Sequence, residues 1–107
     1  MLVDSHCHLN YEGLAERQAE VLAHARAQGV RGFLNISTRQ SEWAAVVATA
    51  EREADVWATI GIHPHEADGH ADLGKGALLQ ASEHPKVIGI GETGLDFYHQ
   101  TSPRAVQ

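Results

Sequence analysis

The sequence predicts an α/β fold built on a parallel sheet. Strand-like and helix-like segments alternate along the chain, and the links between them are short. The apolar run Val87-Ile88-Gly89-Ile90 has hydrophobic residues on both faces, which is typical of a parallel strand covered on each side. Right-handed crossovers between such strands then produce one parallel sheet.

The first half of the chain predicts two strand–helix units. Leu2–His6 is a short apolar strand, and Leu14–Gln28 has apolar residues at helical spacing, ended by Gly29. Val30–Ser37 is the second strand. Ser41 is expected to cap a helix that runs to about Glu53, with Trp43, Val46, Val47 and Ala50 on one face.

The second half predicts two more strands and one helix. Val56–Ile62 is the third strand, Leu73–Glu83 a weaker helix that ends before Pro85, and Val87–Gly91 the fourth strand. Ser102 and Pro103 have the pattern of an N-cap followed by the first helical residue, which predicts that another helix begins there.

The number of elements predicts part of a larger domain. A barrel of eight strand–helix units usually takes about 250 residues, and four strands with three helices are half of that. We therefore expect residues 1–107 to be the N-terminal half of a truncated domain. The first and fourth strands would then have exposed edges, through which the chain could self-associate.

Composition excludes several classes of protein. Hydrophobic residues make up 43% of the chain, which is enough for a folded core, and the net charge of −6 argues against a basic nucleic-acid surface. One cysteine allows no internal disulfide, and no long apolar run predicts a membrane segment or signal peptide. These features predict a cytoplasmic protein with no membrane partner.

The segment Asp4-Ser5-His6-Cys7-His8-Leu9 carries the strongest chemical signal. Residues two apart in a strand face the same side, so His6 and His8 are expected to project together. Neutral imidazoles are good ligands for divalent first-row metals. Cys7 faces the other way and is interpreted as a small buried hydrophobe.

Polar residues also follow two later strands. His63, Pro64 and His65 come after the third strand, and Glu92 follows the fourth. The carboxyl ends of parallel strands meet at one rim, so these side chains should lie near His6 and His8. Imidazoles with a carboxylate form the ligand set of a catalytic metal site. Asn35, at the end of the second strand, is expected to support that site.

Three segments together resemble the TatD family of metal-dependent deoxyribonucleases, a branch of the amidohydrolase-like superfamily. They are Asp4-Ser5-His6-Cys7-His8-Leu9, Gly61-Ile62-His63-Pro64-His65 and Gly91-Glu92-Thr93-Gly94-Leu95-Asp96-Phe97-Tyr98. The resemblance implies a TIM-barrel hydrolase that cleaves the phosphodiester bonds of DNA through two-metal activation of water. The implied cofactors are two divalent metal ions, Mg²⁺ first, with Zn²⁺ or Mn²⁺ as alternatives.

The resemblance also implies roles for particular residues. His6, His8 and Glu92 would bind metal, with Glu92 bridging two ions. Glu92 and His63 would be the catalytic residues, and His63 and His65 would face the DNA substrate. Family members take further ligands from later strands, for which this sequence has no positions. His99 stands where the family frequently has an arginine.

Two other functions remain open from the sequence. One is an amidohydrolase-type enzyme that cleaves C–N or C–O bonds. Such relatives often bridge their metals with a carboxylated lysine after the fourth strand, where this chain has Glu92 and no adjacent lysine. The other is a non-catalytic, metal-binding half-barrel fragment, with function belonging to a longer parent.

Overall fold

The computed structural model, which describes residues 1–107, confirms the alternation of strands and helices. Its strands and α-helices, in chain order, are β1 Leu2–Cys7, α1 Gln18–Ala27, β2 Val30–Asn35, α2 Trp43–Arg52, β3 Val56–Ile60, α3 Lys75–Ser82 and β4 Val87–Ile90. Three short 3₁₀ segments join them: η1 Ala15–Arg17, η2 Gln40–Glu42 and η3 Pro64–His70.

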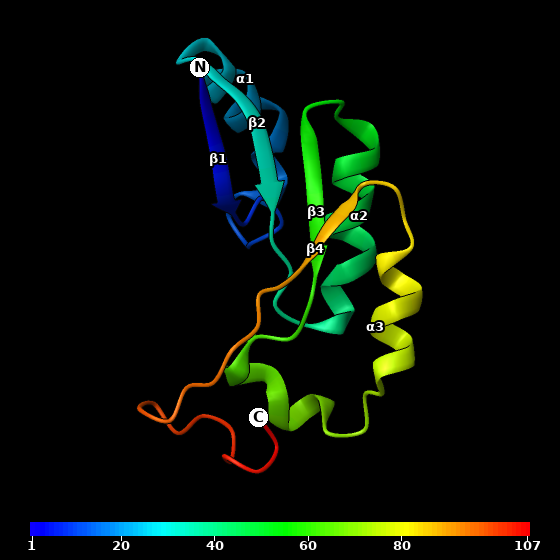
Figure 1. Ribbon diagram of the computed structural model, residues 1–107. Coiled ribbons are helices and arrows are strands. Elements are labelled where there is room, and N and C mark those ends of the chain that lie inside the picture. Colours follow the sequence, from blue (N-terminus) through cyan, green and yellow to red (C-terminus); the bar gives the residue numbers. More distant parts are fainter.

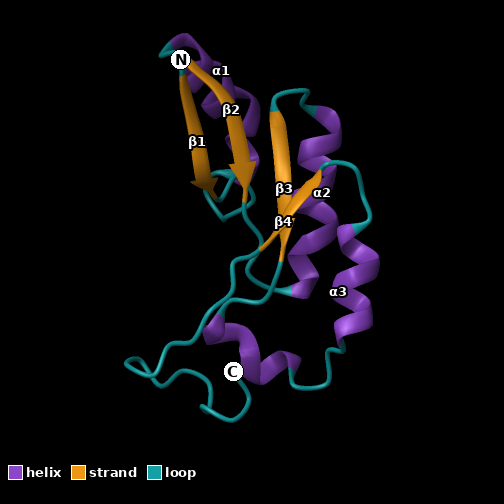
Figure 2. Cartoon of the chain, viewed as in Figure 1, coloured by secondary structure: helices purple, strands orange, loops and turns teal.

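The four strands form one sheet in the order β1-β2-β3-β4, and every neighbouring pair is parallel (Figure 1). The helices lie along one side of this sheet, with α1 behind β1 and β2, and α2 and α3 beside β3 and β4 (Figure 2). Because all strands run in the same direction, the segments that follow them leave the sheet at one end. This is the rim that the sequence predicts for the site.

The core lies between the helices and the sheet. Leu22 from α1, Val46 from α2 and Val56 from β3 are fully buried, and burial of each such side chain contributes about 1.5–3 kcal/mol. On the predicted apolar face of α2, Trp43, Val46 and Ala50 are buried. Helical spacing of apolar residues therefore identified the buried face of this helix correctly.

The sheet leaves apolar side chains in solvent at both ends of its strand order. Leu2 and Val3 on β1 are 61% and 63% exposed, and Ile88 and Ile90 on β4 are 61% and 53% exposed. Neither β1 nor β4 has a strand on its outer edge. Unpaired edges with exposed apolar residues are surfaces on which another chain segment can pair.

Two predicted helix caps are wrong. Ser41 lies inside η2, and α2 begins at Trp43, because the Glu42 carboxylate instead accepts hydrogen bonds from Thr38 N and Oγ1, both at 3.0 Å. The predicted helix at Ser102 is only a single turn, in which Val106 and Gln107 donate to Pro103 O. The Ser102 hydroxyl does not cap that turn, since it bonds residues of η3.

Cys7 is half-buried against the core, and its thiol donates to Leu34 O at 3.4 Å. Burial, with a smaller contribution from Asp4, raises the pKa of the Cys7 thiol from 9.0 to about 12. Between these two pKa values the thiol stays protonated in the folded chain but ionises in the unfolded chain. The free energy of unfolding should therefore fall as the pH rises from 9.0 toward 12.

We expect Cys7 to be unreactive in the folded chain. At about pH 8.5, a disulfide reagent should modify it at least about 100-fold more slowly than it modifies the unfolded chain, since the thiolate is the reactive form. Absorbance of the released thiol in buffer and in denaturant measures the two rates. Equal rates would contradict the predicted burial.

No helix of the structure is both long enough and apolar enough to span a membrane.

Candidate metal centre

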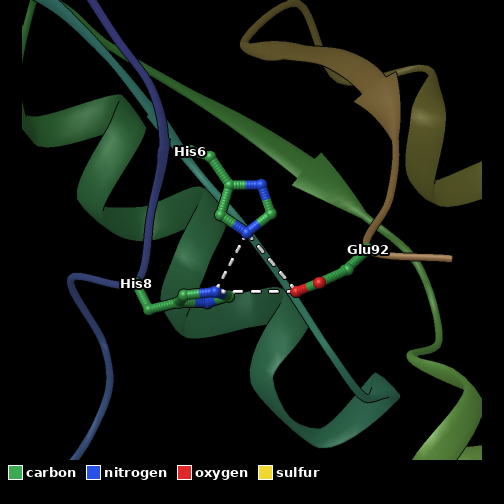
Figure 3. Close-up of side chains that lie close together, drawn as sticks. All are labelled: His6, His8 and Glu92. Atoms are coloured by element: carbon green, nitrogen blue, oxygen red, sulfur yellow. Dashed lines mark hydrogen bonds and ion pairs between the residues drawn. The ribbon is translucent and has the colours of Figure 1, made fainter.

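Three side chains from opposite ends of the chain meet at the rim (Figure 3). His6 lies in β1, His8 follows it directly, and Glu92 lies two residues past β4. His6 Nε2 is 3.2 Å from His8 Nε2, and Glu92 Oε2 is 3.5 Å from His6 Nε2 and 3.6 Å from His8 Nε2. The structure thus brings together the residues that the sequence proposes as metal ligands.

The spacing of these atoms suits a divalent cation. Zinc bonds to imidazole nitrogen and carboxylate oxygen are about 2.0–2.1 Å long, so neighbouring ligands of a tetrahedral ion are about 3.3 Å apart. The three observed separations, 3.2 to 3.6 Å, match that value closely. Two imidazoles and a carboxylate also leave open positions, which a catalytic metal needs for water and substrate.

Asn35 fixes the chain just after His8. It is fully buried at the end of β2, where its Oδ1 accepts a hydrogen bond from Leu9 N at 2.9 Å and its Nδ2 donates to Asn10 Oδ1 at 2.7 Å. A buried amide that satisfies its partners in this way holds the backbone in one position. Asn35 therefore supports the site by placing His8.

Backbone hydrogen bonds place Glu92 beside the histidines. Glu92 N donates to Ser37 O at 2.7 Å, and Gly91 N donates to Ile60 O at 2.9 Å. Ser37 is itself buried and donates through its hydroxyl to Thr59 O at 2.7 Å. Glu92 is thus fixed by the ends of β2 and β3, and its position is set by the sheet rather than by a free loop.

His63 faces the second oxygen of Glu92. Its Nε2 is 3.9 Å from Glu92 Oε1, while its Nδ1 accepts a hydrogen bond from His65 N at 3.0 Å. A ring nitrogen that accepts a hydrogen bond carries no proton, so in the neutral ring the proton is on Nε2. His63 therefore presents a donor to the space beside Glu92.

Tyr11 is a neighbour of the centre that sequence reasoning missed. Its ring stacks on His8, with centroids 4.2 Å apart and planes 14° from parallel. Burial, then the negative charge of Glu42, raises the pKa of the Tyr11 hydroxyl. His8 Nδ1 is buried without a hydrogen-bond partner, so the stacked Tyr11 ring and the contacts of Nε2 orient the imidazole. No spacing in the sequence signals the contact, because it depends on the loop after β1.

His65 pairs with Asp96 and not with Glu92. Its Nε2 lies 2.5 Å from Asp96 Oδ2, and His99 Nδ1 lies 2.7 Å from the same oxygen. The sequence-based prediction did not include Asp96 or His99 among the site residues. The segment is not helical, so the short separation of Asp96 and His99 in the sequence is the only signal that could have linked those two residues.

A protein-family model now identifies the chain, since the model described as "TatD related DNase" matches residues 3–107. The chain belongs to this TatD family.

Relatives of known name agree with this membership. The "3'-5' ssDNA/RNA exonuclease TatD" of Cronobacter turicensis is 40% identical over 88 residues, which cover 82% of this chain and 34% of that protein. The "uncharacterized metal-dependent hydrolase YabD" of Bacillus subtilis is 31% identical over 107 residues, which cover 100% of this chain and 42% of that protein.

A solved structure of another TatD homologue shares the fold. A crystal structure of YjjV, a TatD homologue from Escherichia coli, aligns with a TM-score of 0.72 and 26% sequence identity, covering 91% of this chain and 38% of that chain. The TatD-family chain described here thus spans about a third to two-fifths of the length of these relatives. The four parallel strands correspond to part of the barrel.

Proposed function

We propose that this chain carries part of the active site of a metal-dependent hydrolase that cleaves phosphodiester bonds of DNA. The observation that carries the proposal is the triangle of His6 Nε2, His8 Nε2 and Glu92 Oε2 at the strand rim. Relatives named as an exonuclease and as metal-dependent hydrolases support it. Residues 1–107 would then correspond to the N-terminal half of the complete domain.

We propose two divalent ions as cofactors, Mg²⁺ first, with Zn²⁺ or Mn²⁺ as alternatives. His6 and His8 would hold one ion together with Glu92 Oε2. Glu92 Oε1 faces away from that pair, toward His63, and is free to bind a second ion. When bound, divalent ions lower the pKa of a water toward neutrality and balance charge on phosphate oxygens.

The protein's own residues supply orientation. Glu92 N donates to Ser37 O, which fixes the backbone from which its carboxylate projects toward the histidines. His63 offers its Nε2 proton at the same place, where it can donate to a phosphate oxygen of the substrate. We propose His65 beside it as a second substrate contact. The chain has 14 acidic and 8 basic residues, so its net charge alone would repel DNA. Bound cations would supply the positive charge that DNA needs at this site.

A nuclease assay tests this proposal. A 3′-labelled single-stranded oligonucleotide is incubated with the chain in Mg²⁺, Mn²⁺ or Zn²⁺, and in a chelator. We expect cleavage that requires the metal and that is absent from the His6→Ala/His8→Ala variant. The matched control is His24→Ala, which removes an exposed imidazole from α1.

The same assay tests self-association, which we propose occurs through the exposed edges of β1 and β4. If two copies complete one site, the specific activity should rise with chain concentration. Cleavage that is unchanged in the double variant would mean that a contaminant is responsible. No cleavage at any concentration would contradict the proposal that two copies complete one site.

A further inference from the structure

A second group of metal-ligating side chains lies outside the triangle of His6, His8 and Glu92. It combines His65 of η3 with Asp96 and His99, which belong to the segment after β4. In Figure 1 this segment, coloured orange to red, lies beside η3 at the rim end of the sheet. The ligand atoms of these three residues all lie within 4.8 Å of one another.

The Asp96 carboxylate is held in one orientation. Its Oδ1 accepts hydrogen bonds from Tyr98 N at 3.0 Å and from His99 N at 3.1 Å, which leaves Oδ2 for the two imidazoles. The Gln107 side chain holds the backbone on both sides, accepting from Asp96 N at 2.7 Å and donating to Asp96 O at 2.9 Å. Metal ligands in proteins are typically fixed by such outer hydrogen bonds.

The charge at this position also suits a cation. The hydrogen bond from His65, followed by those from His99, lowers the pKa of Asp96 well below its usual range. The carboxylate is therefore ionised and accepts only. Two imidazoles that converge on one anionic oxygen form a set of nitrogen and oxygen ligands preferred by Zn²⁺ and similar first-row ions.

We propose that His65, Asp96 and His99 form a second divalent-metal site, separate from the site of His6, His8 and Glu92. The proposed ligand is Zn²⁺ or a similar first-row ion, bound by three protein atoms with one position open. All three ligands are present in this chain, so the site needs no residue from a longer parent or from a partner.

Only a small movement is needed to admit the ion. The two imidazole–carboxylate distances, 2.5 and 2.7 Å, are hydrogen-bonding distances. In a tetrahedral site they would open to about 3.3 Å, since the bonds to zinc are about 2.0–2.1 Å long. The His99 side chain is 59% exposed, so its ring can rotate without displacing the core.

The second site adjoins the first without sharing its ligands. The His65 and His63 rings are in edge-to-face contact, with centroids 4.5 Å apart. A cation on His65 would therefore face a phosphate bound beside His63, which agrees with the substrate contact proposed above. That agreement rests on the proposed function, whereas metal binding itself does not.

Calorimetric titration with Zn²⁺ alone, without any nucleic acid, tests the proposal. We expect His99→Gln to bind one Zn²⁺ fewer than the parent chain, or to bind that ion at least about ten-fold more weakly. The matched control is His84→Gln, because His84 also pairs with a carboxylate, Glu51, at 2.6 Å, but has no second histidine beside it. It should bind as many ions as the parent chain.

A second measurement uses the unmodified chain and does not depend on how a variant folds. Addition of paramagnetic Co²⁺ should broaden the imidazole NMR signals of His65 and His99 together, at the same metal ratio. Identical Zn²⁺ titrations for His99→Gln and the parent chain, or His65 and His99 signals unaffected by Co²⁺, would overturn the proposal. A nuclease-inactive chain that passes both tests would contradict the proposed function alone.

Discussion

Replacing Glu92 with glutamine should weaken metal binding at the rim by at least about 100-fold, because loss of an outer-shell partner alone costs 10–100-fold. Glutamine keeps the size of the side chain but removes the only anionic ligand of the triangle. The amide cannot accept through both of its terminal atoms, so the oxygens that face His6 and His63 are no longer equivalent. Metal-dependent cleavage should fall at least as far.

Calorimetry with Mn²⁺ or Zn²⁺ measures this loss, and circular dichroism with urea unfolding shows whether the fold is unchanged. Glu83→Gln is the matched control, since it removes one carboxylate at the exposed end of α3 and should bind as tightly as the parent. If Glu92→Gln retained full affinity, Glu92 would not be a ligand, and the proposed function would lose the observation that carries it.

The placement of the rim residues could be predicted from the sequence because it follows from topology. Once the strands are parallel, every residue that follows a strand lies at the same end of the sheet. His6 ends the predicted first strand and His8 follows it, and Glu92 follows the predicted fourth strand. These local patterns therefore predicted a meeting between residues more than 80 positions apart, which the structure shows at 3.5 and 3.6 Å.

The remaining contacts could not be predicted, because they depend on where loops run. The pairing of His65 with Asp96 requires η3 and the segment after β4 to lie side by side, and no periodicity reports that. Ser41 failed as a cap for a related reason, since the Glu42 carboxylate bonds Thr38 instead. Serine near a helix start is a local signal, and a competing side-chain contact can override it.

Gly61 lies closer to a neighbouring backbone than any other glycine of the chain. It lies one residue past β3 and two before His63, and an added Cβ would be 2.5 Å from Gly91 C and 2.6 Å from Gly91 O. Atoms this close must move apart, and here the neighbour is backbone that cannot rotate away. Since Gly91 immediately precedes Glu92, a shift there moves the Glu92 carboxylate directly.

Gly61→Ala should therefore destabilise the chain by about 3 kcal/mol, at the upper end of the usual cost of overpacking. It should also weaken metal binding at the His6–His8–Glu92 triangle, because the ends of β3 and β4 are forced apart. Urea unfolding and Zn²⁺ calorimetry measure the two effects. Gly76→Ala is the matched control: it lies in α3 with open space around it and should stabilise the chain by about 0.5–1 kcal/mol.

Both variants add one methyl group to a glycine. Their comparison therefore separates the contact between residue 61 and Gly91 from the general effect of alanine on the entropy of the unfolded chain. A destabilised Gly61→Ala chain with unchanged metal affinity would show that the strand ends can separate without moving Glu92. Glu92 would then be positioned by the hydrogen bond from its backbone N to Ser37 O alone. Loss of both stability and affinity would show that the close approach of β3 and β4 is what aligns Glu92 with the two histidines.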